Sequence, residues 1–297
     1  MEMTNAIEEQ ALAEKAGWHT AGEQVPWRQV SLFIGLAYGL SWLWWAPIVL
    51  PQLGMVSLVG RLPDLTHNPA LARLTLGMFG PMAAAVMMRL VVSREGIKGS
   101  LGMLRPWRYY LIAFAVPALF IAVLIGVNQF TGLGRFVWTR SLPIWAAYPL
   151  VVFLNSAVGT PLTFGEEYGW RGYLLPRLLP LGEVRATLLL GLIWALWHLP
   201  ALSIGLNYPG QPFWAALLVF TLNILLLAFP FTWLYTASRE SPVVTAVMHA
   251  TLNAAGDGFT TPTYVPNGNS LVVGGGGLVA AGLMLVIVIM RYTLPKR

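Results

Sequence analysis

Long apolar segments, each close to the length that crosses a bilayer, restrict this chain to very few folds. Eight of them follow one another with short polar loops between, at about residues 30–50, 71–92, 109–130, 144–171, 185–204, 212–235, 242–257 and 271–291. Since a transmembrane helix needs about 20 predominantly apolar residues, the sequence predicts an all-α polytopic membrane protein with about eight helices in a bundle. The seventh segment is short and carries polar residues, so we expect the other helices to surround it.

The overall composition supports a membrane-embedded chain. Of the 297 residues, 57% are hydrophobic and 10% are charged. A soluble domain, by comparison, carries about 25% charged residues. The chain has no cysteine, which excludes disulfides, thiolate metal sites and a cysteine nucleophile.

The chain divides into a polar tail and one apolar domain. Residues 1–28 are polar, contain five glutamates and lack an apolar core. They are therefore not a signal peptide, and we expect a cytosolic tail. Residues 29–297 contain no convincing internal repeat and no linker long enough to separate domains. We expect them to form a single transmembrane helical domain.

The distribution of basic residues predicts how the chain lies in the membrane. The formal charge is +6, and the lysines and arginines stand mostly in short loops between apolar segments. With the N-terminus placed on one side, fourteen of the 18 basic residues fall on that side and four on the other. Cytoplasmic loops carry such an excess. We predict a multi-pass protein of the plasma (inner) membrane with both termini in the cytoplasm, and the same distribution argues against nucleic-acid binding.

Two acids and one base stand at the end of the fourth apolar segment, in EEYGWR at residues 166–171. Ionisable residues at membrane depth are expensive, so they mark a candidate functional site. Glu167 and Arg171 are i and i+4 with the acid first, which is the favourable order for a helical ion pair. Glu166 is rotated by about 100° on a helix. We predict that it faces the bundle interior without a cationic partner, where it can act as a general base on water.

Histidine and asparagine add polar groups to two later apolar segments. His198 stands in the fifth segment, and His249 and Asn253 are i and i+4 on one face of the seventh. An imidazole and an amide can together hold the tetrahedral oxyanion that forms when water attacks a peptide bond. A carboxylate, two histidines and an amide therefore form a candidate site for peptide hydrolysis.

The same residues also match a metal site. Glu166, His198 and His249 provide a His₂Glu ligand set for zinc with an open position for water. The chain has no His-Glu-x-x-His motif, so the three ligands would come from three different helices. From the residues, a zinc-bound water and a water activated by glutamate and histidine both remain open.

Depths counted along the helices disagree with one another. If the fourth helix ends near Arg171 on the cytosolic side, Glu166 lies about 7 Å inward at a rise of about 1.5 Å per residue. His198, counted from Arg185, lies about 20 Å inward on the same rise. We expect these two side chains to work together, so the fifth helix either starts well outside the membrane or tilts.

Three motifs in order along the chain resemble those of one enzyme family. They are GEEYGWRGYL at residues 165–174, Trp194 four residues before His198, and His249 four residues before Asn253. They resemble the motifs of the CAAX protease and bacteriocin-processing family (CPBP, or Abi), a group of intramembrane endopeptidases. The second motif of that family usually has Phe where this chain has Trp194. The resemblance covers about residues 144–258, which form the expected catalytic core.

The resemblance implies a fold and a set of roles. It implies an eight-helix α-bundle with a conical cavity open to the cytosol. It implies that Glu166 and His198 activate the water, and that His249 and Asn253 stabilise the oxyanion. Both a metalloprotease mechanism and a metal-free glutamate mechanism are argued for the family, so the resemblance leaves the metal open.

We therefore expect an intramembrane endopeptidase that hydrolyses a peptide bond near the cytosolic face. Its substrate would be a membrane-associated or lipidated protein or peptide. By the same resemblance, Glu167 and Arg171 are structural supports. The alternative from another class is a non-catalytic membrane binding or immunity protein that uses the polar cluster to hold a partner. An ion-coupled transporter fits less well, because such proteins often show paired repeats.

Overall fold

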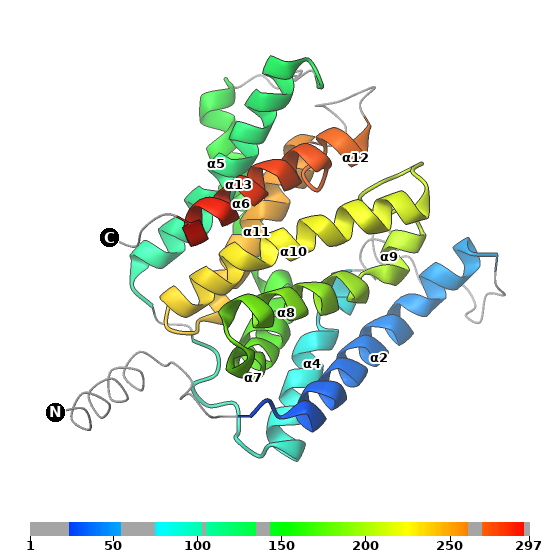
Figure 1. Ribbon diagram of the computed structural model, residues 1–297, viewed down its shortest axis with the longest axis vertical. Coiled ribbons are helices and arrows are strands. Elements are labelled where there is room, and N and C mark those ends of the chain that lie inside the picture. The colour runs from blue at the N-terminus through cyan, green and yellow to red at the C-terminus, as the bar shows by residue number, and fades with distance from the viewer. Residues whose placement is uncertain (1–23, 55–74, 103–104, 135–142, 261–268, 294–297) are drawn as a thin grey trace.

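The computed structural model describes residues 24–54, 75–102, 105–134, 143–260 and 269–293 (Figure 1). Within these ranges the chain is helical and contains no strand. The α-helices are α2 (Trp27–Gln52), α4 (Gly80–Met87), α5 (Trp107–Thr131), α6 (Ile144–Gly169), α7 (Leu175–Leu178), α8 (Glu183–Trp197), α9 (Leu199–Ser203), α10 (Phe213–Ala237), α11 (Pro242–Thr260), α12 (Ser270–Val273) and α13 (Leu278–Thr293). Two π-helical segments, η1 (Met88–Val92) and η2 (Trp170–Leu174), and one 3₁₀ segment, η3 (Leu179–Leu181), extend them. The all-α class is confirmed; most of the predicted polar tail lies outside the described residues.

Six helical segments are long and apolar enough to cross a membrane, as expected for a polytopic membrane protein. They span residues 27–51, 75–92, 107–131, 147–181, 213–237 and 270–293, and they match six of the eight predicted segments. The predicted segment 185–204 is divided into α8, of 15 residues, and the short α9. At about 1.5 Å per residue α8 is about 22 Å long, which is less than a hydrocarbon core of about 30 Å.

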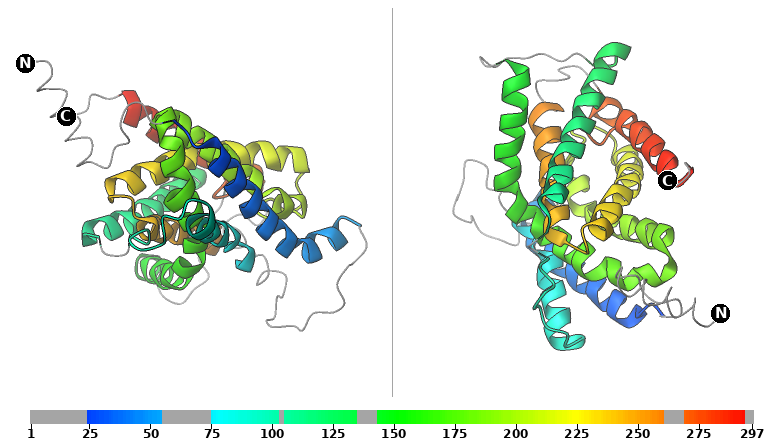
Figure 2. Two further views of the ribbon diagram at one scale, coloured as in Figure 1. Left: turned by 90° about the horizontal axis from the view of Figure 1, so that it is seen from below. Right: turned by 90° about the vertical axis from the view of Figure 1, so that its left-hand side faces the viewer.

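The short seventh segment lies inside the bundle. It forms α11, which packs most extensively against α6 and α5 and also contacts α10 (Figure 2). Its residues Val244, Ala246 and Ala255 are fully buried. This burial agrees with the expectation that other helices surround the segment, and it places two of the three predicted motifs side by side.

The fourth predicted segment does not end at Arg171, as we expected. The helix continues from α6 through η2 and α7 as far as Leu181. The expectation was wrong because Arg171 is completely buried rather than exposed at the membrane surface. Glu166 is therefore 15 residues from the end of its segment, and His198 is 15 residues from Glu183, where α8 begins. At about 1.5 Å per residue both lie about 22 Å along their helices, so the predicted mismatch in depth disappears.

Two glycines let α4 approach α6 directly beside the acidic pair. Gly165 and Gly169 are i and i+4, so they lie on one face of α6. A Cβ atom on Gly169 would lie 2.4 Å from Cβ and 2.6 Å from the carbonyl carbon of Pro81, in the first turn of α4. A Cβ atom on Gly165 would lie 2.9 Å from the carbonyl oxygen of Met78. Small residues thus hold α6 close to α4 and turn Glu166 and Glu167 toward other helices.

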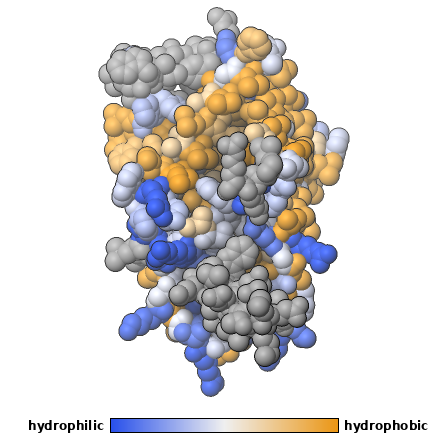
Figure 3. Space-filling view, turned by 60° about the vertical axis from the view of Figure 1, so that its left-hand side comes forward, coloured by the Kyte–Doolittle hydropathy of each residue, from blue (hydrophilic) through white to orange (hydrophobic). Residues whose placement is uncertain are grey.

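Hydrophilic and apolar side chains separate along the long axis of the molecule. In Figure 3 the hydrophilic side chains concentrate in the lower half, and the upper half is mostly apolar. Large apolar side chains are exposed on several helices, among them Leu43, Leu119, Phe130, Val158 and Leu218. Exposed apolar surface of this extent is expected where lipid covers the protein.

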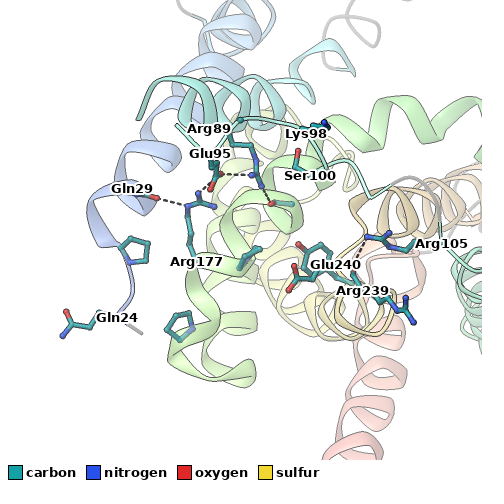
Figure 4. Close-up of a pocket in the computed structure, with 17 residues that line it drawn as sticks. Gln24, Gln29, Arg89, Glu95, Lys98, Ser100, Arg105, Arg177, Arg239 and Glu240 are labelled. Carbon is teal, nitrogen blue, oxygen red and sulfur yellow. Dashed lines mark hydrogen bonds and ion pairs between the residues drawn. The ribbon is translucent and has the colours of Figure 1, made fainter. Parts of the chain in front are cut away.

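Five basic side chains define what we call the basic end: Arg89, Lys98, Arg105, Arg177 and Arg239. They line a polar cavity of about 680 Å³ (Figure 4). Here Arg89 and Arg177 each donate to Oε1 of Glu95, at 2.7 and 2.9 Å. Arg105 donates through Nε to the carbonyl oxygen of Ser238 across 2.9 Å, which joins the start of α5 to the end of α10.

Candidate active site

The ion pair predicted between Glu167 and Arg171 is present. Nη1 of Arg171 donates to Oε1 of Glu167 across 2.9 Å, and both side chains are fully buried. The guanidinium carbon of Arg171 lies 4.2 Å from the ring centroid of Trp194 and 4.5 Å from that of Phe231. Two aromatic faces therefore stabilise a cation that has left water. The spacing of the motif predicted the pair, and the fold provides the aromatic cover.

Glu167 has a second partner, which is His249 of α11. Nδ1 of His249 lies 3.0 Å from Oε1 of Glu167. A carboxylate oxygen accepts, so Nδ1 carries the hydrogen in this contact. The other ring nitrogen, Nε2, is then free to meet a ligand. Glu167 thus connects α6 to α11 and sets the orientation of the imidazole.

Glu166 is held by an indole rather than by a cation. Nε1 of Trp194 donates to Oε2 of Glu166 across 2.8 Å. The Glu166 residue is 2% exposed and lines a cavity. A hydrogen bond to a buried carboxylate is stronger than one between neutral groups. The indole therefore fixes one carboxylate oxygen and leaves the other available.

The backbone of Trp194 holds His198 as well. Nδ1 of His198 lies 2.8 Å from the carbonyl oxygen of Trp194. A carbonyl oxygen only accepts, so Nδ1 donates here and Nε2 is left as an acceptor. This contact occurs where α8 ends and the short α9 begins. Trp194 therefore orients Glu166 through its indole and His198 through its main chain.

One cavity collects the four residues predicted to be catalytic. It measures about 710 Å³, and Glu166, His198, His249 and Asn253 all line it. They come from α6, from the junction of α8 and α9, and from α11. Asn253 is exposed and has no hydrogen bond to another residue in the described part of the chain. Its amide is therefore available to a ligand in the cavity.

The zinc alternative involves Glu166, His198 and His249. Among the described residues, no three histidine, aspartate or glutamate side chains are grouped so that they could hold one metal ion. The contacts of His249 to Glu167 and of Glu166 to Trp194 leave Nε2 of the imidazole and one carboxylate oxygen unused. These hydrogen bonds are therefore compatible with a metal-bound water and with a metal-free mechanism.

Sequence reasoning missed the contribution of two aromatic residues. Trp194 appeared only as a variant of a motif position, and Phe231 of α10 did not appear at all. The rings of Trp194 and Phe231 lie 5.5 and 5.7 Å from the ring of His249, both nearly perpendicular to it. An aromatic side chain with an N–H donor, four residues before a histidine, is the signal that could have pointed to Trp194.

Comparison with known proteins agrees with the motifs. The sequence model of the type II CAAX prenyl endopeptidase Rce1-like family matches residues 145–255. The match over residues 145–255 supports the resemblance to the CAAX protease and bacteriocin-processing family. A CAAX prenyl protease 2 from Methanococcus maripaludis is 26% identical over 149 residues. That alignment covers 48% of this chain and 53% of the relative, so the chain spans about half the length of the curated relative it matches.

The matched segment, residues 145–255, contains every residue that sequence analysis singled out for chemistry. It begins within α6 and ends within α11. The matched residues therefore include both acids, both site histidines, Asn253 and the tryptophan that holds Glu166. The comparisons therefore agree with the motifs on which residues to consider for chemistry.

Proposed function

We propose that this protein is an intramembrane endopeptidase in which Glu166 and His198 activate a water molecule. The observation that carries the proposal is the single cavity lined by Glu166, His198, His249 and Asn253. Three helices contribute them, and each of the first three has its orientation held by a hydrogen bond from or to a buried partner. Such preorganised polar groups are what catalysis of amide hydrolysis requires.

Activation of the water follows from which atoms are free. One oxygen of Glu166 and Nε2 of His198 can both accept, so together they can hold both hydrogens of a water molecule. The water oxygen attacks the carbonyl carbon of the peptide, and Glu166 takes the proton. A carbon–oxygen bond forms, and the carbonyl electrons move onto oxygen. The product of this step is a tetrahedral oxyanion.

In this proposal, side chains of α11 stabilise the oxyanion. Nε2–H of a protonated His249 and the amide N–H of Asn253 are the two donors available on its cavity face. His249 can carry this second proton because its Nδ1–H already donates to the Glu167 carboxylate. The carbon–nitrogen bond then breaks, and the proton held by Glu166 passes to the leaving amine. We propose Glu167 and Arg171 as the buried support of this arrangement.

The proposed substrate is a membrane-associated or lipidated protein or peptide. Apolar and aromatic side chains provide much of the cavity wall, including Trp45, Phe120, Phe220, Leu227 and Met284. This lining favours a peptide with apolar residues around the scissile bond.

The test is cleavage of a defined peptide library by purified protein in detergent or vesicles, read by mass spectrometry. We expect Glu166→Gln to lower the rate about 10²- to 10⁴-fold, the range for a general base, with unchanged melting temperature. Glu183→Gln, an equivalent change at the start of α8 and outside the cavity, should retain the rate. If wild type and Glu166→Gln both fold and neither cleaves any peptide, the proposal is wrong and the binding-protein alternative is favoured.

A further inference from the structure

The polar cavity at the basic end, which we call the basic cavity, takes no part in the proposed peptide hydrolysis. It shares no lining residue with the cavity that Glu166 lines, so the two are separate sites. Its wall carries the five basic side chains of the basic end against two carboxylates, those of Glu95 and Glu240. We propose that the basic cavity binds the phosphate-bearing headgroup of an anionic phospholipid. Such binding requires no peptidase activity.

One side of the basic cavity is a network of charges that the protein itself satisfies in part (Figure 4). Arg89 and Arg177 both donate to Oε1 of Glu95, across 2.7 and 2.9 Å. Arg89 also donates to the carbonyl oxygen of Gly172 across 2.7 Å, and Arg177 to that of Tyr173 across 2.9 Å. One carboxylate therefore serves two guanidinium groups, and one positive charge of this network is left without a negative counterpart.

Two exposed basic side chains of the wall, Lys98 and Arg239, have no protein partner. Within the part of the chain that the structure describes, neither side chain makes a hydrogen bond or an ion pair. Arg105 fixes the turn that carries Arg239, because its guanidinium donates to the carbonyl oxygens of Ser238 and Arg239, both across 2.9 Å. A cleft lined by charges of one sign attracts a ligand of the opposite sign, and Lys and Arg hydrogen bonds to phosphate are among the strong ones.

The loop that carries Lys98 adds main-chain donors to the same wall. Gly96 and Gly99 line the cavity with φ angles of +71° and +84°, which glycine adopts at little steric cost. The N–H groups of residues 96–99 make no hydrogen bond to any other residue that the structure describes. Successive free N–H groups in a turn of this kind form a concave site for an anion.

Contacts at three positions hold this loop in place. Near its start, the carboxylate of Glu95 accepts from two arginines. Further along, Oγ of Ser100 lies 2.7 Å from the hydroxyl oxygen of Tyr168 in α6. At its end, Oγ of Ser241 donates to the carbonyl oxygen of Gly102 across 2.6 Å. Because the loop is anchored while its N–H groups are unpaired, its donors are preorganised for a ligand.

Exposed aromatic and apolar side chains place the basic cavity at the level of lipid headgroups. Trp27 and Trp107, within two positions of lining residues, are 52% and 75% exposed. Tryptophan is enriched at the boundary between membrane and water. Ile97 and Leu101 expose apolar side chains from the loop that carries Lys98. Since basic pockets between helices on the cytoplasmic side bind anionic headgroups, the phosphate is that of a lipid rather than that of a soluble anion.

The size and construction of the basic cavity predict what a bound headgroup would do. Its volume of about 680 Å³ lies within the range of about 300–1,000 Å³ for small-ligand sites. The start of α2, η1 and the loop after it, η2 and α7, and the end of α10 all contribute to its wall. A ligand that binds these segments only when they are assembled stabilises the folded chain.

The test compares two double variants of the full-length protein, purified in a neutral detergent at physiological salt. Lys98→Gln/Arg239→Gln removes the two unpartnered cations of the wall. Arg185→Gln/Arg291→Gln, the matched control, removes two exposed arginines that do not line the cavity. Each protein would be titrated with phosphatidylglycerol, phosphatidylcholine or inorganic phosphate. The unfolding temperature gives the apparent affinity, and native mass spectrometry counts the lipid molecules retained.

We expect phosphatidylglycerol to raise the unfolding temperature of the wild type saturably, and the other two probes to raise it little at equal concentration. Lys98→Gln/Arg239→Gln should bind phosphatidylglycerol at least about tenfold more weakly and retain fewer molecules, because each basic residue near an anionic lipid surface adds about fivefold in affinity. Arg185→Gln/Arg291→Gln should stay within about twofold of the wild type, because separated surface charges are largely screened at this salt concentration.

Four results would overturn the proposal. Absence of any response to phosphatidylglycerol would show that the cavity binds no anionic headgroup. An equal response to phosphatidylcholine would show that anionic charge is not selected, and an equal response to inorganic phosphate would show that the ligand is a soluble anion. Equal weakening in the two double variants would show that the lipid responds to net charge alone. Both readouts require no hydrolysis, so failure of the proposed peptidase activity would leave them unchanged.

Discussion

The indole N–H of Trp194 donates to Oε2 of Glu166 across 2.8 Å, so a residue of α8 holds the carboxylate that we propose as the general base. The main-chain oxygen of the same tryptophan holds His198 at 2.8 Å. A phenylalanine at this position would lack the N–H donor. One residue therefore holds both side chains that we propose as activators of the water.

Replacement of Trp194 tests that relationship. We expect Trp194→Phe to keep the fold and the contact to His198, and to lower kcat about tenfold or more with little change in KM. A hydrogen bond to a charged group contributes about 1.5–3 kcal/mol, and about 1.4 kcal/mol is tenfold in rate. Steady-state kinetics on a cleaved peptide gives both constants. In the Glu166→Gln background the same change should have almost no further effect; an equal loss in both backgrounds would contradict a role through Glu166.

Removal of Arg171 should affect stability first. Arg171→Ala leaves the Glu167 carboxylate buried without its cation, and breaking a buried ion pair costs about 3–5 kcal/mol. We expect poor insertion or a clearly lower unfolding temperature in detergent. Arg108→Ala, at an exposed arginine at the start of α5, is the matched control and should leave the unfolding temperature unchanged. If Arg171→Ala is as stable as the control, the pair is not a structural support.

The close approach of α4 to α6 predicts that alanine substitutions at two glycines affect stability differently. Gly169→Ala places a methyl group 2.4 Å from Cβ of Pro81, so backbone must move. Overpacking of this kind costs about 1–3 kcal/mol. Gly126→Ala, in α5 with nothing within 4 Å of the added atom, should instead be neutral or stabilise, because Ala favours a helix by about 1 kcal/mol over Gly. The unfolding temperatures of both variants test this prediction. Equal stability of the two variants would mean that the close contact of Gly169 with Pro81 does not affect stability.

Treatment with a chelator distinguishes a zinc-bound water from a water activated by glutamate and histidine, the two mechanisms that the sequence left open. With water activated by Glu166 and His198, we expect incubation with EDTA or 1,10-phenanthroline, followed by desalting, to leave the cleavage rate within about twofold of that before treatment, since a metal-free mechanism loses nothing to a chelator. The metal content of the treated protein would be measured in parallel. Loss of activity on chelation, with recovery on addition of zinc, would show that a metal takes part.

Much of the site could be predicted from residue order because its contacts are local. The ion pair of Glu167 and Arg171 followed from i, i+4 spacing, and the shared face of His249 and Asn253 followed in the same way. The apolar segments predicted the helical class, since a spanning helix is recognised by length and hydropathy. Six of the eight predicted segments are long apolar helices in the structure.

Contacts between distant segments depended on the tertiary structure. The bond from His249 to Glu167 spans 82 positions, and the bond from Trp194 to Glu166 spans 28. Helical periodicity carries no information about which faces meet, so neither could be read from spacing. The same reason explains why Arg171 looked like a residue of the membrane surface, although it is buried against Trp194 and Phe231. The cavity lined by Glu166, His198, His249 and Asn253 likewise arises from packing, because loop charges orient a chain without showing where its interior is hollow.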